Sequence, residues 1–267
     1  MLLTVQGVDA YCYTGGKPFN HALPTVVFIH GAQNDHSVWI LQTRYFAHHG
    51  YSVLAVDLPG HGRSKGAAKG SVPDLADWLL ELLDAAGVQT AALFGHSMGS
   101  LIALEASFKA PQRVSHLAMI GSTYPMKVSE ALLESARTDE QSAIDMVNTW
   151  SHSTIAQMPS RQGPGFNPMG GARRLMQRIA QINPDQVFHT DFAACNAYAN
   201  GEAAAQAVRC PTLFLFGARD MMTPPKSTKL LTTTIAHAKV LTIDSGHALM
   251  TEQPDAVLDA LFSFMGT

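Results

Sequence analysis

The segment "AALFGHSMGSLIALEASFKA" (residues 91–110) joins a short apolar run to a helical pattern through a Gly-x-Ser-x-Gly motif. The run at 91–95 suits a strand buried on both faces, and a helix is expected over 98–109. A serine between such a strand and helix is typical of a nucleophile elbow, where it is held exposed at a sharp turn. Gly95 and Gly99 fit because they omit side chains where strand and helix crowd together. The segment therefore predicts an α/β fold with Ser97 as a candidate nucleophile.

The rest of the chain repeats this alternation of strand and helix. Further short apolar runs, bounded by Gly, Asp or Ser, lie at 25–30, 52–57, 115–121, 212–217 and 239–244. The first residues, "LLTVQGV" and "DAYCYTGG", indicate an opening hairpin. Helices are expected near 38–49, 73–86, 225–235 and 252–265. The alternation predicts a doubly wound, mainly parallel sheet of eight strands.

One long segment interrupts this rhythm. Residues 125–207 contain helical stretches at 128–150 and 172–182, separated by the Gly/Pro-rich joint "PSRQGPGFNPMGG" (159–171). No strand pattern occurs between them. The sequence therefore predicts a helical cap, or lid, at 125–207, inserted into a core that comprises residues 1–124 and 208–267.

Composition narrows the class of protein. Apolar residues make up 46% of the 267 residues and charged residues 15%, which is ample for a large core. The formal net charge of -3, without a basic block, argues against nucleic acid as a partner. No apolar run approaches a membrane span, and the N-terminus lacks the pattern of a signal peptide. The three cysteines are scattered and suggest neither zinc nor disulfides, so we expect a cytoplasmic protein without a bound metal.

A second Gly-x-Ser-x-Gly match, "GRSKG" at 62–66, offers Ser64 as a rival nucleophile. The segment follows "DLPGHG" and precedes "KGAAKG", both rich in turn-forming residues. It therefore lacks the flanking strand and helix of an elbow. Ser64 is expected to be a solvated loop residue or a helix cap, and Ser97 is favoured as the nucleophile.

A serine nucleophile needs a histidine base and a carboxylate that orients it. On folds of this kind the chain order is Ser, acid, His. His247 comes directly after the strand at 239–244, on the carboxyl side where active sites of open α/β sheets gather. Asp220 lies just past the carboxyl end of the strand at 212–217. Asp244 competes, but it is too near His247 in sequence to approach the ring from the side away from Ser97.

Backbone N–H groups are the expected donors to an oxyanion. The first is the N–H of Met98, which follows the nucleophile. The second comes from the loop "HGAQNDHSVW" after the first long parallel strand, where Ala32 is the natural donor. This pattern predicts an oxyanion hole that consists of main-chain groups.

Several segments together resemble the α/β-hydrolase superfamily, specifically its capped esterase, lipase and haloperoxidase-like branch. They are "FIHGAQNDHSVW", "VLAVDLPGHGRS", "ALFGHSMGS", "LFGARDMMTP" and "DSGHALMTEQP", and they occur in the family's order. The resemblance covers nearly everything outside the cap, and it is specific for the fold and the triad rather than for substrate. It implies a serine hydrolase without a cofactor, and it supports an architectural role for the Ser64 loop.

The expected reaction is hydrolysis of carboxylic esters through an acyl-enzyme intermediate, with Ser97, His247 and Asp220 as the triad. Methionines near the inferred mouth suit small to medium apolar acyl groups, so Met126 and Met222 are candidate substrate contacts. His36 is a third candidate, for which capping of the next helix is the alternative role. The expected partner is a small-molecule ester, and the chain is expected to be a monomer or a small homo-oligomer.

Other functions remain open from the sequence. The same triad serves lactonases and hydrolases that cleave a carbon–carbon bond next to a ketone. The ring-cleavage hydrolases of the latter type often carry Asn before the nucleophile, where this chain has His96. A non-catalytic receptor that kept a hydrolase pocket is the alternative from a different class.

Overall fold

The computed structural model describes residues 1–158, 167–183 and 185–266, so most of the Gly/Pro-rich joint at 159–171 lies outside the described residues. The eight-stranded sheet has the order β1-β2-β4-β3-β5-β6-β7-β8. Its strands are β1 (Leu2–Val5), β2 (Val8–Tyr13), β3 (Thr25–Ile29), β4 (Ser52–Val56), β5 (Ala91–His96), β6 (Val114–Ile120), β7 (Thr212–Gly217) and β8 (Lys239–Ile243). The expected eight-stranded α/β fold is confirmed.

The sheet is parallel from β4 to β8 across its order, and antiparallel only at the opening hairpin. β1 and β2 pair antiparallel, and β2 also pairs antiparallel with β4. The hairpin turns at Gln6 and Gly7, whose φ angles of 51° and 80° are typical of a tight two-residue turn. β3, β4, β5 and β7 are buried along their whole length, because helices cover both faces of a parallel sheet.

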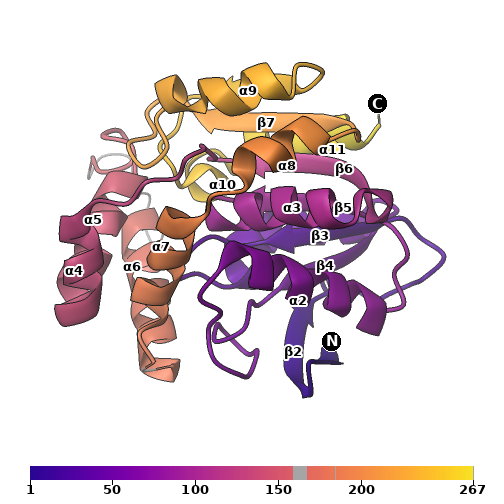
Figure 1. The fold of residues 1–267 in the computed structure, drawn as a ribbon, viewed down its shortest axis with the longest axis horizontal. Helices are drawn as coiled ribbons and strands as arrows, with labels where there is room; N and C mark the ends of the chain where they lie inside the picture. The colour runs from indigo at the N-terminus through magenta and orange to yellow at the C-terminus, as the bar shows by residue number, and fades with distance from the viewer. Residues whose placement is uncertain (159–166, 184, 267) are drawn as a thin grey trace.

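Helices form a layer on each face of the sheet (Figure 1). α2 (Val72–Ala85), α3 (Met98–Lys109) and α9 (Lys229–Thr234) share one apolar cluster with the sheet. α1 (Ile40–His48) and α11 (Pro254–Met265) belong to a second cluster on the other face. Short helices η1 (His36–Trp39), η2 (Pro111–Arg113), η4 (Pro225–Thr228) and α10 (Leu249–Glu252) complete the core. The predicted helices at 38–49 and 225–235 each begin with one of these 3-10 turns.

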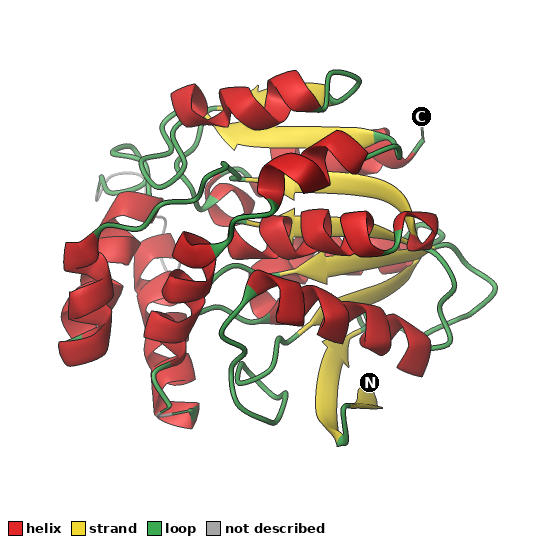
Figure 2. Ribbon diagram, in the orientation of Figure 1, coloured by secondary structure: helices red, strands yellow, loops and turns green. Residues whose placement is uncertain are grey.

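Between β6 and β7 the described residues form helices joined by loops, with no strand. The insertion contains α4 (Glu130–Thr138), α5 (Glu140–Ser151), α6 (Pro168–Ile182), α7 (Val187–Ala197) and α8 (Gly201–Ala207). α4 to α7, here called the cap helices, stand together beyond the ends to which the arrows of the parallel strands point (Figure 2). They share an apolar cluster of their own around Leu132, Ile144 and Phe188.

α8 differs from the cap helices in its packing. Ala204 and Ala205 are buried in the same cluster as α3, on one face of the sheet. The helix lies beside α3 in Figure 1 rather than among α4 to α7. The boundaries 125–207 remain a prediction, and α8 lies with the core near the end of that range. No helix in the described part of the chain is long and apolar enough to cross a membrane.

Candidate active site

Ser97 lies at a strained bend between β5 and α3. Its φ and ψ angles are 52° and −119°, a left-handed conformation that a residue with a side chain rarely adopts. Such a conformation costs roughly 1–3 kcal/mol and persists only where the surroundings enforce it. A Cβ on Gly95 would overlap the carbonyl oxygen of Gly99, and one on Gly99 would overlap those of Ile29 and His30. The two glycines of the motif therefore let the bend pack against β3.

Gly95→Ala tests this packing. We expect it to lower the free energy of unfolding by about 2 kcal/mol, because the new methyl group forces backbone shifts at the bend. Gly70→Ala is the control, since a Cβ on Gly70 meets nothing within 4 Å. Urea unfolding of both variants should show a loss for Gly95→Ala and a change within about 0.5 kcal/mol for Gly70→Ala. Equal stability of the two variants would contradict the account of the bend.

His247 and Asp220 are joined by a buried hydrogen bond. Nδ1 of His247 lies 2.7 Å from Oδ2 of Asp220. Asp220 follows β7 and His247 follows β8, so the carboxyl ends of neighbouring strands bring them together. Asp244, the rival carboxylate, is exposed and pairs instead with Arg219. The structure therefore brings together the acid and base that the sequence favours.

The Asp220 carboxylate is held ionised. Its Oδ1 accepts hydrogen bonds from the backbone N–H groups of Met222 and Thr223, each at 2.8 Å, and its Oδ2 accepts one from the Thr223 hydroxyl at 2.6 Å. Burial alone raises the pKa of this carboxyl group, but His247 and these donors outweigh burial and lower the pKa to about 2.

This lowered pKa predicts how stability depends on pH. A carboxyl group whose pKa is lower in the folded than in the unfolded chain stabilises the fold above its unfolded pKa, and that stability is lost as the pH falls. For Asp220 the loss lies between about pH 5 and pH 2. The stability advantage of the wild type over Asp220→Asn should shrink by about 1 kcal/mol between pH 6 and pH 3. Urea unfolding at both pH values measures it, and an unchanged or growing advantage would contradict the assignment.

Ser97 and His247 lie on the wall of one cavity. We call it the larger cavity, because a second one beside Ser97 is smaller. It has a volume of about 390 Å³ and is enclosed by the loop after β3, by α5 and α6 of the cap, and by the residues around His247. No described residue hydrogen-bonds to the Ser97 hydroxyl within 3.5 Å. Contacts of this kind are often long before substrate binds. A molecule bound in this cavity can therefore contact both Ser97 and His247.

The segment that carries His247 is held from two sides. The His96 ring donates from Nε2 to the His247 carbonyl oxygen at 2.9 Å, and burial lowers the pKa of His96 to about 3, so the ring is neutral. The Glu252 carboxylate accepts from the backbone N–H of Gly246 at 3.1 Å and from that of Ser153 at 3.0 Å. Because Ser153 follows α5, Glu252 connects the segment that carries His247 to the cap.

Two backbone N–H groups beside Ser97 are unused. Ala32 lies in the loop of residues 30–35, called here the β3 loop, and Met98 is the first residue of α3. Within the described chain, neither N–H donates a hydrogen bond to another residue. The first N–H groups of a helix have no partner inside the helix and favour negative charge. A Cβ on Gly31 would lie 3.1 Å from the Ser97 Cβ, so the β3 loop passes close to the serine.

The cap holds the β3 loop through Asp191 of α7. The buried Asp191 carboxylate accepts from the Gln33 backbone N–H and pairs with Nε2 of His61, each at 2.8 Å. Burial alone lowers the pKa of His61, but Asp191 outweighs burial and raises it. The Gln33 side chain also donates to the Met176 carbonyl oxygen of α6 at 3.1 Å. The position of Ala32 therefore depends on how the cap is docked.

The predicted substrate contacts divide into two groups. Met222 lines both the larger cavity and a smaller one of about 160 Å³, and Met126 lines the smaller one. His36 does not reach either cavity. Its backbone N–H and its Nδ1 both contact Oδ1 of Asp57, at 2.8 and 2.7 Å, and its ring lies 5.1 Å from that of Tyr11. It is the first residue of η1, but the cap of that helix is Asp35, whose side chain accepts from the Ser37 N–H, so the alternative prediction that His36 caps the helix is not met either.

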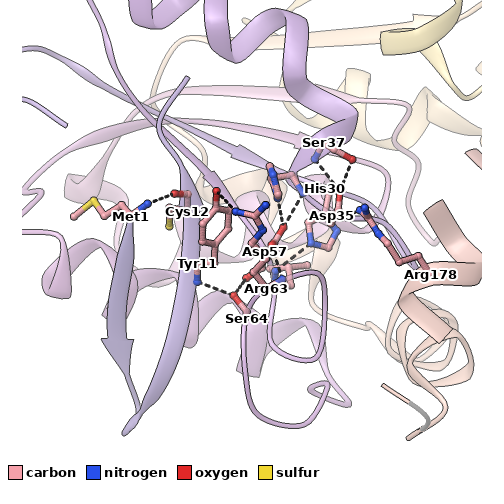
Figure 3. A network of polar contacts seen from close by, with 12 residues as sticks. Met1, Tyr11, Cys12, His30, Asp35, Ser37, Asp57, Arg63, Ser64 and Arg178 are labelled. Atoms are coloured by element: carbon pink, nitrogen blue, oxygen red, sulfur yellow. Dashed lines mark hydrogen bonds and ion pairs between the residues drawn. The ribbon is translucent and has the colours of Figure 1, made fainter. Parts of the chain in front are cut away.

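Ser64 is structural rather than solvated, so that expectation was wrong. The serine is buried, and its hydroxyl donates to the Asp57 carbonyl oxygen at 2.6 Å and accepts from the Tyr11 N–H at 2.9 Å. Figure 3 shows it within a polar network that fixes the loop after β4 against β2. A hydroxyl engaged in this way is unavailable as a nucleophile.

One group of residues has the spacing of a metal site. Asp35, His36 and Asp57 each offer an atom within 4.8 Å of the others. These atoms already have partners, because Asp57 accepts from His36 and Arg63 while Asp35 pairs with Arg178 and Ser37 (Figure 3). The donor set suits a loop anchor better than a cation.

Two residues of the larger cavity were missed by the sequence analysis. They are His152 and Asn148, which belong to the insertion and line the cavity from the cap side. The spacing of four residues, which places both on one side of a helix, was the available indication. It could not be used without knowing which side faces the core.

Comparisons with known proteins identify the family. A family model described as the alpha/beta hydrolase fold matches residues 24–254. The chain belongs to this family of α/β-fold hydrolases.

Individual relatives differ in what they act on. The chain is 26% identical over 254 residues to the (E)-2-((N-methylformamido)methylene)succinate hydrolase of Acinetobacter baylyi, which covers 91% of this chain and 90% of the relative. It resembles the enol-lactonase of Burkholderia xenovorans with a TM-score of 0.85, 20% identity and full coverage of both chains. It resembles the esterase of Exiguobacterium antarcticum with a TM-score of 0.81 and 18% identity, over 100% of this chain and 99% of that one. At these identities the structural likeness shows the fold alone.

Proposed function

We infer that the protein is a serine hydrolase that cleaves carboxylic esters through an acyl-enzyme intermediate. The observation that carries this inference is the His247–Asp220 pair at 2.7 Å, on the wall of the cavity that Ser97 also lines. The strained bend at Ser97 and the two unused N–H groups beside it supply the other parts that acyl transfer requires.

The reaction proceeds in two halves. His247 takes the Ser97 proton through Nε2 as Oγ attacks the ester carbonyl carbon, while the N–H groups of Ala32 and Met98 stabilise the oxyanion. Asp220 accepts the hydrogen bond from Nδ1, which fixes the tautomer and stabilises the imidazolium. His247 then protonates the leaving alcohol, and water repeats the sequence to release the acid. Each step uses groups of this chain alone.

An ester and a lactone are the candidate substrates, and the fold is compatible with either, since it is shared with an esterase and an enol-lactonase. The relative named for a succinate derivative raises a carbon–nitrogen bond as a second candidate. Among the described residues that line the larger cavity there is no Arg or Lys to hold a dicarboxylate. The larger cavity therefore favours a neutral group, whereas Lys127 lines the smaller cavity.

A panel of p-nitrophenyl esters, γ- and δ-lactones and neutral amides tests the proposal. We expect the wild type to hydrolyse p-nitrophenyl acetate and butyrate at rates well above background. Amides should be hydrolysed more slowly than these esters. Faster hydrolysis of the lactones than of the esters would indicate that the protein is a lactonase. Binding of these compounds with negligible turnover would contradict hydrolysis and support a ligand receptor.

A further inference from the structure

Two cavities meet at Ser97. The larger, of about 390 Å³, and the smaller, of about 160 Å³, share Ala32, Ser97, Phe192 and Met222. An ester also has two parts, which separate at the carbonyl carbon that Ser97 attacks. The cavity pair therefore has one compartment for each part of the substrate, provided that the proposed function holds.

His247 determines which part enters which cavity. It lines the larger cavity and is absent from the described residues around the smaller one. The alcohol oxygen must lie beside His247 to receive its proton. The leaving alcohol therefore belongs to the larger cavity. The acyl group is left with the smaller one, whose wall includes the apolar residues Met126, Val128 and Leu132.

The larger cavity has polar residues on its cap side. His152 directly follows α5 as its C-cap residue, and its Nδ1 lies 2.8 Å from the Asn148 carbonyl oxygen. A carbonyl oxygen only accepts, so Nδ1 carries the proton. Burial lowers the pKa of His152, so its ring is neutral and Nε2 is an acceptor.

This acceptor has no partner, and neither does a second one beside it. Nε2 of His152 and Oδ1 of Asn148 are both buried, and neither has a hydrogen-bond partner among the described residues. The two residues are 2% and 6% exposed, so bulk solvent does not satisfy these atoms. Buried polar groups in proteins are nearly always paired, and an unpaired one is a candidate for ligand recognition.

We propose that the preferred substrate is an ester of a short acyl group with an alcohol that carries its own hydrogen-bond donor, a hydroxyl or an amide N–H, which His152 and Asn148 accept. Oγ of Ser97 bonds to the acyl carbon as the bond to the alcohol oxygen breaks. The Ser97 proton passes through His247 to that oxygen, and water then releases the short acid. The class of leaving group is thus a diol or a hydroxy amide rather than a plain alkanol.

Matched acetates test the alcohol side. The series 2-hydroxyethyl, 3-hydroxypropyl and 4-hydroxybutyl acetate is compared with propyl, butyl and pentyl acetate, in which a methyl group replaces each terminal hydroxyl. We expect kcat/KM, measured by acid release, to be at least about tenfold higher for one hydroxy ester than for its alkyl counterpart. Equal or higher values for all three alkyl esters overturn the proposal.

Variants assign that preference to the cap residues. His152→Phe and, independently, Asn148→Leu should abolish the hydroxyl preference while alkyl acetates are still hydrolysed. Thr149→Ala is the control, because Thr149 is an exposed residue of the same helix and is not among the residues that line either cavity. A preference that persists in both cap variants overturns the role of His152 and Asn148.

The acyl side is tested with p-nitrophenyl acetate and octanoate, which share a leaving group. The wild type should favour acetate, and Leu132→Ala should raise the octanoate to acetate ratio by about tenfold, because it enlarges the smaller cavity. Leu175→Ala in the larger cavity should change both esters alike. A shift of the ratio by Leu175→Ala alone overturns the placement of the acyl group in the smaller cavity.

The outcomes distinguish this inference from the proposed function. Failure of the wild type to hydrolyse any ester contradicts the proposed function itself, whereas ester hydrolysis without these preferences contradicts only this inference.

Discussion

Replacing Ser97 with alanine is expected to lower kcat/KM for p-nitrophenyl acetate by about 10⁴-fold or more. The variant keeps the cavity, the His247–Asp220 pair and both N–H donors, so only the attacking oxygen is lost. The residual rate should approach that of water attack assisted by the oxyanion donors. Stopped assays with purified enzyme, corrected for spontaneous hydrolysis, measure the change.

Ser64→Ala is the matched control for this prediction. It removes the other serine of a Gly-x-Ser-x-Gly motif, and Ser64 lies in the loop network rather than in the cavity. We expect reduced stability, because the Asp57 carbonyl oxygen and the Tyr11 N–H each lose a hydrogen bond. Activity should stay within a few-fold of the wild type for the folded fraction. Comparable loss of activity in both variants would argue against Ser97 as the nucleophile.

Asp220→Asn is expected to lower kcat by about 10⁴-fold, with the geometry of the site retained. An amide at this position can donate to Nδ1, which favours the imidazole tautomer that carries its proton on Nε2. Such a ring cannot accept the serine proton. The charge that stabilises the imidazolium is lost as well. KM should change little, because Asp220 is not among the residues that line either cavity.

Asp244→Asn provides the comparison for Asp220→Asn. Asp244 is only three positions before His247 in the sequence, but its carboxylate is exposed and pairs with Arg219. A surface pair of this kind contributes about 0–1 kcal/mol, so neither activity nor stability should change much. A large loss of kcat in Asp244→Asn, with Asp220→Asn active, would reverse the assignment of the acid.

Much of the fold was predictable because its elements are locally determined. The buried strands are short apolar runs between turn-forming residues, and the motif around Ser97 contains the glycines that the bend requires. Asp220 and His247 were predictable for a geometric reason. Residues that directly follow parallel strands meet at one edge of the sheet, whatever their separation in the chain.

The features that the sequence did not predict depend on contacts between distant segments rather than on local sequence. Ser64 looked solvated because its loop is polar, yet its hydroxyl is used by Tyr11 of the hairpin. His36 lies near the site in sequence, but Asp57 of a neighbouring loop holds its ring. The role of Asp191 depends on a contact between α7 and Gln33 of the β3 loop. Such pairings have no local pattern in one sequence.

Covalent labelling tests the central claim most directly. The protein is treated with a fluorophosphonate, digested, and its peptides are identified by mass spectrometry. We predict one phosphonyl group per chain, on the hydroxyl of Ser97, and none in Ser97→Ala. Labelling of another residue, or hydrolysis of p-nitrophenyl acetate that survives complete labelling of Ser97, would contradict the account.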